Sequence, residues 1–362
     1  MTDEHKMLQN SAERYLRENY DFAARQHSID RGNAIDAEHW RAFSDMGWTA
    51  MTIPEAADGF GFGLADIAPV IELFGYYLVR EPLLESALLA GELIAAASEA
   101  HQTRYLPGII DGSVIATVAQ QDATPLTRQG KASGQRLQGD LQFVPSGGIA
   151  SHVLAPLRHD NQPHWVMLDL SLEGISRERY QSHDGRQGAH ITIDLPFDDS
   201  CVLVSGIQAE VATQALYQRA MLIGAAEGVG IMQGALDLTV EYTRQREQFG
   251  QALASFQALQ HRMADMLIQT ELARSLVLAA CHAWDNQADN TSTLALAAKA
   301  KVDAAARTVT QEAIQMHGGI ATTNEYKVGH YFKRMALLES WPQHRDALIA
   351  QLIQNRQASI TP

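Results

Sequence analysis

The sequence contains only two cysteines, Cys201 and Cys281, among its 362 residues. Two thiols are too few for a disulfide framework, and their scarcity fits a reducing compartment. We interpret both as small buried hydrophobic residues. A disulfide-rich secreted fold is therefore excluded.

Positive charge is also scarce. The 28 lysines and arginines are outnumbered by 42 aspartates and glutamates, which gives a net charge of -14. Nucleic-acid binding needs a basic face that neutralises phosphates, and no basic patch stands out, so we expect no nucleic-acid partner. No pair of histidines falls at metal-ligand spacing on a helix with a third ligand in reach, so we predict no metal site.

Long apolar runs are missing as well. No run reaches the roughly 18 residues that a membrane-spanning helix needs. The first residues, MTDEHKMLQNSAERYLREN, are polar and acidic, unlike a signal peptide. These features predict a cytoplasmic protein without a membrane span.

Hydrophobic patterning divides the chain into three parts. Residues 1–110 read as helical, and within them the apolar, alanine-rich run PLLESALLAGELIAAASEA from Pro82 to Ala100 is predicted to form one helix. Residues 111–205 change to short β-branched runs such as HVLAPLR and HITIDL, separated by Gly, Asp, Asn and Pro, which predict a small β domain. Residues 206–362 return to long helices and predict a helical bundle domain.

The stretch from Thr243 to Met266 joins two long helices of the last part. The first helix ends near Arg246, a turn is expected at Phe249 and Gly250, and a second apolar helix follows. Guanidinium matches phosphate oxygens and an aromatic ring covers a flat face, so Arg246, Phe249 and Gln257 suit a phosphate-bearing ring cofactor. The alternative is an arginine that only caps helix carbonyls and complements the helix dipole.

Three stretches resemble acyl-CoA dehydrogenases. RQREQFGQALASFQALQHRMADM resembles the first signature of that family, and QMHGGIATTNEYKVGHYFKR (Gln315 to Arg334) resembles the second. MGWTAMTIPEAADGFGFG (Met46 to Gly63) is similar to the family's proline-and-glycine loop. YKVGHYFKR and the short chain look most like the branch with the small subunit of pimeloyl-CoA dehydrogenase and one subunit of heteromeric steroid side-chain acyl-CoA dehydrogenases.

This resemblance implies a fold and an activity. The fold would comprise an N-terminal α-helical domain, a small middle β domain and a C-terminal four-helix-bundle domain. The activity would be FAD-dependent α,β-desaturation of an acyl-CoA thioester, of dicarboxylyl or steroid side-chain type. A larger homologous subunit in an α2β2 assembly, or a homo-oligomer, and an electron-transfer flavoprotein as electron acceptor are the implied partners.

The resemblance also implies residues that hold the ADP part of FAD, which is bound mainly by a neighbouring subunit. They are Arg246, Phe249, Gln257, Gln315, Gly318 and Gly319. His317 would lie beside this group, or serve in capping or packing. The middle domain departs from the family, because Ala119–Gly130 and Phe143–Ser151 replace the patterns that cover and bond the flavin ring.

The general base is not obvious. The family's Glu in a Tyr-Glu-Gly-Thr loop is absent after Arg334, and the position used by some relatives falls at Ala220. Glu227 sits among apolar and glycine residues without a polar partner one turn away, so we expect it to be protonated or to face a cavity, as a base would. The alternative for Glu227 is an ion pair with an arginine of another helix. Glu339 is the second candidate, although a loop or helix-start position also explains it.

Further expectations concern the substrate. Gly224, Gly228 and Gly230 would thin the helix beside Glu227, where a substrate could pass. The donors for the thioester oxygen would come from the short Leu338–Gln343 loop, because the N–H of a mid-helix Glu227 is already bonded. Two alternatives stay open: a non-catalytic subunit kept for assembly, and another flavoenzyme of the same fold, such as an acyl-CoA oxidase or a nitroalkane oxidase.

Overall fold

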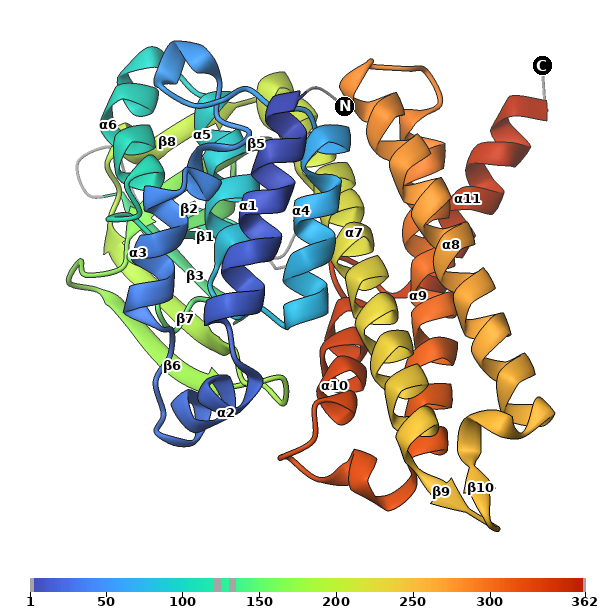
Figure 1. The fold of residues 1–362 in the computed structure, drawn as a ribbon. Coiled ribbons are helices and arrows are strands. Elements are labelled where there is room, and N and C mark those ends of the chain that lie inside the picture. Colours follow the sequence, from blue (N-terminus) through green and yellow to red (C-terminus); the bar gives the residue numbers. More distant parts are fainter. Residues whose placement is uncertain (1–2, 120–124, 130–134, 361–362) are drawn as a thin grey trace. The chain divides into compact units, whose positions relative to one another are not determined.

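The computed structural model describes residues 3–119, 125–129 and 135–360 (Figure 1). The chain folds into two compact units. Unit 1 comprises residues 1–31, 63–79 and 220–362, and unit 2 comprises residues 32–62 and 80–219. The N-terminal helices are therefore shared between the two units, a division that the hydrophobic pattern does not reveal.

Unit 2 is built on one sheet that has eight strands in the described residues, in the order β6-β7-β3-β2-β4-β5-β8 with β1 paired to β4. Most neighbours are antiparallel, but β1 and β2 run parallel to β4. The strands are β1 (Ala116–Val118), β2 (Leu126–Gln129), β3 (Arg136–Val144), β4 (His152–His159), β5 (Gln162–Asp169), β6 (Ile175–Gln181), β7 (Gln187–Pro196) and β8 (Val202–Ser205).

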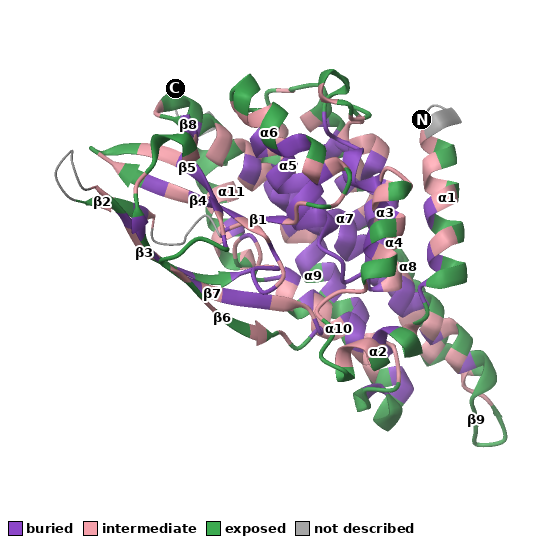
Figure 2. Cartoon of the chain, turned by 90° about the vertical axis from the view of Figure 1, so that its left-hand side faces the viewer, coloured by how far each residue is buried: buried purple, intermediate pink, exposed green. Residues whose placement is uncertain are grey.

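Period-2 alternation explains how the sheet forms. On β7 the buried residues Ile191, Ile193 and Leu195 alternate with the exposed Thr192 and Asp194. Figure 2 colours part of β7 as buried. The buried side chains belong to one hydrophobic core that is made mostly by the strands. The runs HVLAPLR and HITIDL fall on β4 and β7 as predicted.

Short helices complete unit 2. They are α3 (Ala37–Asp45), α5 (Gly91–Ala95), α6 (Glu99–Ile110), the 3-10 turns η1 (Trp48–Ala50), η2 (Glu55–Ala57) and η4 (Asp199–Cys201), and the π-helix η3 (Leu84–Ala90). The prediction of one continuous helix from Pro82 to Ala100 is wrong. A π-helical segment, a short α-helix and a break before α6 occupy that run.

Unit 1 is helical. Its helices are α1 (Asp3–Asn19), α2 (Phe22–Asp30), α4 (Leu64–Tyr77), most of α7 (Ile207–Gln245), α8 (Gln257–Asp285), α9 (Thr291–His317), α10 (Val328–Leu338) and α11 (Arg345–Ile360). Helix α9 packs against α8, α10 and α11. Asp285, the last residue of α8, caps α4 by accepting from the N–H groups of Leu64 at 2.7 Å and Ala65 at 2.8 Å.

Helix α7 is the long apolar helix of the sequence. Among the described residues it alone is long and apolar enough to cross a membrane by composition, and 83% of its most apolar window is buried inside the protein. Glycines allow this burial. A Cβ added at Gly230 would lie 1.7 Å from the Glu72 carbonyl oxygen, and one at Gly75 would lie 2.0 Å from the Glu227 carbonyl oxygen. Helices α4 and α7 therefore pack backbone to backbone.

Candidate cofactor and catalytic site

The first motif forms a turn at one end of unit 1. After α7, strands β9 (Glu247–Gln248) and β10 (Gln251–Ala252) form a two-stranded ribbon, and η5 (Leu253–Ser255) leads into α8. The turn residues Phe249 (φ 56°) and Gly250 (φ 80°) both have positive φ, which a two-residue type I′ turn requires. The side chain of Phe249 is held outward and is 90% exposed.

The second motif lies at the same end of unit 1 (Figure 1). Helix α9 ends at His317, Gly318 adopts φ 67°, and η6 (Gly318–Thr322) follows. Nothing lies within 4 Å of a Cβ added at Gly318 or Gly319, so packing does not explain these two glycines. A glycine pair with open space fits close approach of a pyrophosphate.

The residues expected to hold ADP share two properties. All of them are exposed, and among the described residues none has a side-chain hydrogen bond or ion pair within the chain. They are Arg246, Phe249, Gln257, Gln315, Gly318 and Gly319. A cation, an aromatic ring, two amides and a glycine pair left uncommitted at one end of the unit fit the ADP portion of FAD.

A groove of about 610 Å³ lies between α7 and α8 near this end. Glu241, Arg244, Met263 and Leu267 are among its lining residues. The surface beside Arg244, near the C-terminus of α7, therefore forms a groove.

His317 is a packing residue in this structure. Its buried ring stacks on Tyr242 with centroids 4.4 Å apart and lies 5.2 Å from the ring of Tyr326. Its Nδ1 bonds the Ala313 carbonyl oxygen at 2.7 Å. Burial lowers the pKa of His317, which favours the neutral imidazole. It joins the ends of α7 and α9 and thereby links the two motifs.

Glu227 has a strong partner. Arg334 on α10 binds its carboxylate from Nε and Nη2, each at 2.7 Å, and the Glu227 side chain is fully buried. The expectation of a carboxylate without a polar partner is therefore wrong. The ion pair with an arginine of another helix, which the sequence left open, is what the structure contains. Such a pair stabilises the charged carboxylate and occupies both of its oxygens, which does not suit a general base.

The glycines near Glu227 do not leave room for a substrate in unit 1. A Cβ at Gly228 would lie 2.5 Å from Val302 Cγ1, and one at Gly224 would lie 3.2 Å from the Trp341 ring. At Gly230 the backbone of α4 blocks the same space. The expectation of open space is wrong, because neighbouring helices and Trp341 fill it. Ala220, on the same helix, is buried too.

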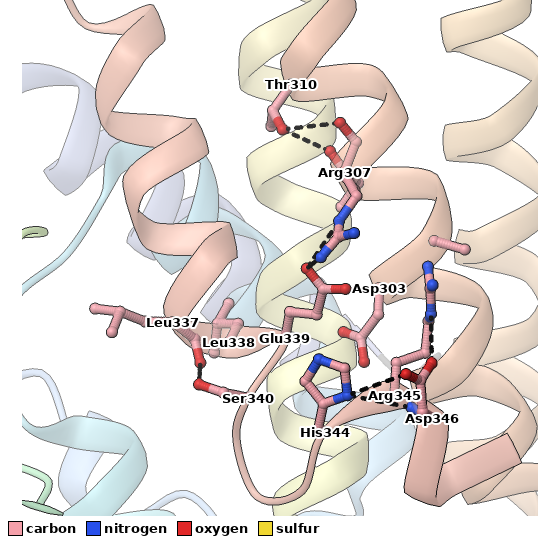
Figure 3. A network of polar contacts seen from close by, with 12 residues as sticks. Asp303, Arg307, Thr310, Leu337, Leu338, Glu339, Ser340, His344, Arg345 and Asp346 are labelled. Carbon is pink, nitrogen blue, oxygen red and sulfur yellow. Dashed lines mark hydrogen bonds and ion pairs between the residues drawn. The ribbon is translucent and has the colours of Figure 1, made fainter. Parts of the chain in front are cut away.

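Glu339 follows the last residue of α10 and caps that helix at its C-terminus rather than starting one. Its Oε2 accepts from Arg307 Nε at 3.0 Å and from Nη2 at 2.6 Å (Figure 3). Its Oε1 is buried and has no hydrogen-bond partner among the described residues. Of the two candidate carboxylates, Glu339 is the one with an uncommitted oxygen.

A buried ion pair next to Glu339 was not anticipated from the sequence. Lys299 Nζ donates to Asp303 Oδ1 at 2.6 Å and to the Leu338 carbonyl oxygen at 2.8 Å, and both side chains of the pair are fully buried. Burial raises the pKa of Asp303 to about 6, and the nearby Glu339 adds to the rise. Burial lowers the pKa of Lys299. The i,i+4 spacing of Lys299 and Asp303 within an alanine-rich run was the available signal.

The middle-domain stretches are only partly visible. Within Ala119–Gly130, residues 120–124 and 130 lie outside the described residues. In Phe143–Ser151, Phe143 has φ 53°, is 57% exposed, and lies 4.7 Å from the His190 ring and 6.3 Å from the Tyr180 ring. In the described part of the chain, no group of three or more His, Cys, Asp or Glu side chains could hold a metal ion.

Comparisons with known proteins agree with this architecture. Two family models match the chain: "Acyl-CoA dehydrogenase, N-terminal domain" over residues 2–113 and "Acyl-CoA dehydrogenase, C-terminal domain" over residues 209–342. The acyl-CoA dehydrogenase IpdE2 of Mycobacterium tuberculosis is 31% identical over 335 residues, which cover 92% of this chain and 91% of that protein. IpdE2 of Mycolicibacterium smegmatis is 29% identical over 335 residues, which cover 92% and 93%.

Two solved assemblies have similar chains. The Tcur3481-Tcur3483 steroid ACAD matches with a TM-score of 0.89 and 28% identity, covering 99% of both chains. The ChsE4-ChsE5 complex of Mycobacterium tuberculosis matches with a TM-score of 0.91 and 23% identity, covering 100% of this chain and 99% of the other. At 23% identity, the similarity to the ChsE4-ChsE5 complex shows a shared fold.

Proposed function

Because the chain belongs to the acyl-CoA dehydrogenase family, with that family's fold, FAD cofactor and oxidoreductase chemistry, we propose that it is one subunit of a heteromeric enzyme. The assembly desaturates a CoA thioester between Cα and Cβ. The partner is a larger homologous subunit in an α2β2 complex, and an electron-transfer flavoprotein accepts the electrons. The substrate carries a steroid side-chain or dicarboxylyl acyl group.

One observation carries the proposal. The ADP-holding residues are exposed and uncommitted at one end of unit 1, whereas arginines bind both candidate bases of the same unit. In this proposal the chain therefore contributes residues for the ADP part of FAD, and another subunit contributes the rest of the catalytic centre. The similarity to the two-protein assemblies Tcur3481-Tcur3483 and ChsE4-ChsE5 supports the same division.

Each group has a defined role in this proposal. When bound, FAD accepts the hydride from Cβ. Arg246 contributes charge to the pyrophosphate, Gly318 and Gly319 allow its close approach, and Phe249, Gln257 and Gln315 complete the ADP contacts. Within this chain Glu339 is the stronger candidate for the base that removes the α-proton, ahead of Glu227. A carboxylate of the partner is the alternative base.

The test is to purify the chain alone and together with a candidate larger homologous subunit, and to record visible spectra and acyl-CoA turnover. We expect little flavin and no turnover from the chain alone, and both from the complex. Full flavin content and turnover by the chain alone would rule out the heteromeric proposal.

A second candidate is a subunit without catalytic groups, retained for assembly. The ion pairs at Glu227 and Glu339 favour it. The discriminating measurement is turnover by a complex in which this chain carries Glu339→Gln. Undiminished turnover excludes Glu339 as the base, and undiminished turnover with Glu227→Gln as well places the base outside this chain. Hydrogen peroxide formation in air, without an added acceptor, would instead indicate an acyl-CoA oxidase-like flavoenzyme.

A further inference from the structure

Lys327 belongs to the second motif, but it has no role in the proposed function. It is the residue before α10, and its side chain is partly exposed. Its Nζ has no hydrogen-bond or ion-pair partner among the described residues, and it is not one of the fully buried polar atoms. Solvent therefore reaches the amine.

Three tyrosine rings flank this amine. Lys327 Nζ lies 5.4 Å from the ring centroids of Tyr76 and Tyr77 on α4 and 5.3 Å from that of Tyr331 on α10. The hydroxyl of Tyr331 donates to the Tyr76 carbonyl oxygen at 2.7 Å, which fixes two of the rings relative to each other. All four residues belong to unit 1, so this tyrosine cage is complete within one unit.

The surroundings of Lys327 favour the neutral amine. Ring faces attract a cation, but they replace only part of the hydration that an ammonium group loses on burial. Burial and, next, the positive charge of Arg25 lower the pKa of Lys327 from 10.5 to about 8, against the opposing effect of Asp21. A desolvated lysine close to another cation is an activated nucleophile.

Two other lysines of unit 1 provide a comparison. Lys301 Nζ donates to Gln269 Oε1 at 2.6 Å, and Lys333 Nζ donates to Asn324 Oδ1 at 2.8 Å. The side chains of both are partly exposed, as is that of Lys327. Exposure therefore does not distinguish the three amines. Lys327 differs because its amine lies among aromatic rings and donates to no acceptor among the described residues.

We propose that Lys327 is a covalent acylation site, at which the ε-amine takes the acyl group of an acyl-CoA thioester. The neutral amine attacks the thioester carbonyl carbon, a C–N bond forms and the C–S bond breaks. The nitrogen loses one proton to the leaving CoA thiolate, so the products are an amide and free CoA. No electrons are transferred. The ring faces of the tyrosine cage suit an apolar acyl chain.

This reaction goes beyond the proposed desaturation and needs only the class of thioester on which the family acts. The experiment uses the full-length chain, in complex with the larger subunit where that complex forms. The probe is acetyl-CoA, which has no Cβ and cannot be desaturated. Peptide mass spectrometry measures the acetylation rates of Lys327, Lys301 and Lys333 in the same molecules, from about pH 6 to about pH 10.

We expect Lys327 to be acetylated roughly tenfold or more faster than Lys301 and Lys333 near neutral pH. Its rate should level off above about pH 8, where most of the amine is neutral. Lys327→Arg keeps a cation in the tyrosine cage but removes the nucleophile, and should abolish acetylation at this position. The matched control, Lys333→Arg, should leave the rate at Lys327 unchanged.

Two results would overturn the assignment. One is acetylation of Lys327 no faster than that of Lys301 and Lys333. The other is a rate at Lys327 that still rises up to about pH 10, as expected for an ordinary lysine, which would indicate adventitious acetylation. Both readouts are independent of the proposed function, because acetyl-CoA cannot undergo α,β-desaturation.

Discussion

Arg334 on α10 donates to both carboxylate oxygens of Glu227 on α7, from Nε to Oε1 and from Nη2 to Oε2, each at 2.7 Å. The carboxylate is fully buried and the arginine side chain is only 11% exposed. This bidentate pair joins two helices of unit 1 and leaves neither Glu227 oxygen available to a substrate proton.

We expect Glu227→Gln to destabilise the protein by roughly 3–5 kcal/mol, because it removes the negative charge that pairs with the largely buried Arg334. The double variant Glu227→Gln/Arg334→Leu should recover a large part of that loss. Denaturant unfolding of the isolated chain measures both. Loss of turnover in Glu227→Gln at an unchanged melting temperature would contradict the structural role and restore Glu227 as the base.

Arg246→Ala should weaken FAD binding by the assembled complex roughly ten- to a hundredfold, because it removes a charge-assisted contact to phosphate. Flavin content after dialysis, read from the visible spectrum, reports the change. Arg244→Ala on the same helix end is the matched control, and should retain flavin. Equal flavin loss in both variants would indicate a general effect of charge rather than a specific contact.

Lys299→Met should cost roughly 3–5 kcal/mol by stranding Asp303 in the core, whereas Lys299→Met/Asp303→Leu should be close to neutral or stabilising. The pair also has a pH signature. The pKa of Asp303 in the folded protein, about 6, exceeds its ordinary value of 3.8. Between these two pH values the folded protein therefore keeps a proton on Asp303 that the unfolded chain has released.

The free energy of unfolding therefore falls as the pH rises from about 4 to about 6, and the contribution of the bound proton is largest at the acid end. The double variant should lack this slope. Urea unfolding at several pH values tests it, and an identical slope in wild type and double variant would be the contrary result.

Gly230→Ala should destabilise unit 1 by roughly 1–3 kcal/mol or more, because the new Cβ meets the Glu72 carbonyl oxygen of α4. Gly319→Ala places its Cβ in open space and should leave the melting temperature unchanged. In the complex, Gly319→Ala should instead lower flavin content. Equal melting temperatures of all three proteins would show that α4 and α7 separate without cost.

Features that depend on residues close together in the chain could be predicted from the sequence. The turn at Phe249 and Gly250 follows from the break between two apolar helices, and the strands at His152–His159 and Gln187–Pro196 follow from β-branched runs. The residues that we predict to hold ADP were identified by resemblance to short motifs, and the structure leaves them exposed. Both kinds of signal lie within a few dozen residues of chain.

The predictions that failed depend on distant segments. Arg334 lies 107 residues from Glu227, so no local pattern shows that they meet. The space beside Gly224, Gly228 and Gly230 would be open on an isolated helix, but here Trp341, Val302 and α4 occupy it. The π register of η3 is equally hidden, since its run has an ordinary helical composition. The ion pair of Lys299 and Asp303 was also missed, but their i,i+4 spacing is a local pattern from which it could have been predicted.

The ribbon that carries Phe249 has two residues in each strand, too few to be stable without cover. A 90% exposed aromatic ring at its tip is a site where proteases and aggregating chains can attack a subunit that has not yet assembled. In the proposed heteromer, this chain made in excess of the larger subunit would remain open to such attack. We therefore expect its abundance to follow that of the larger subunit, because degradation removes the surplus.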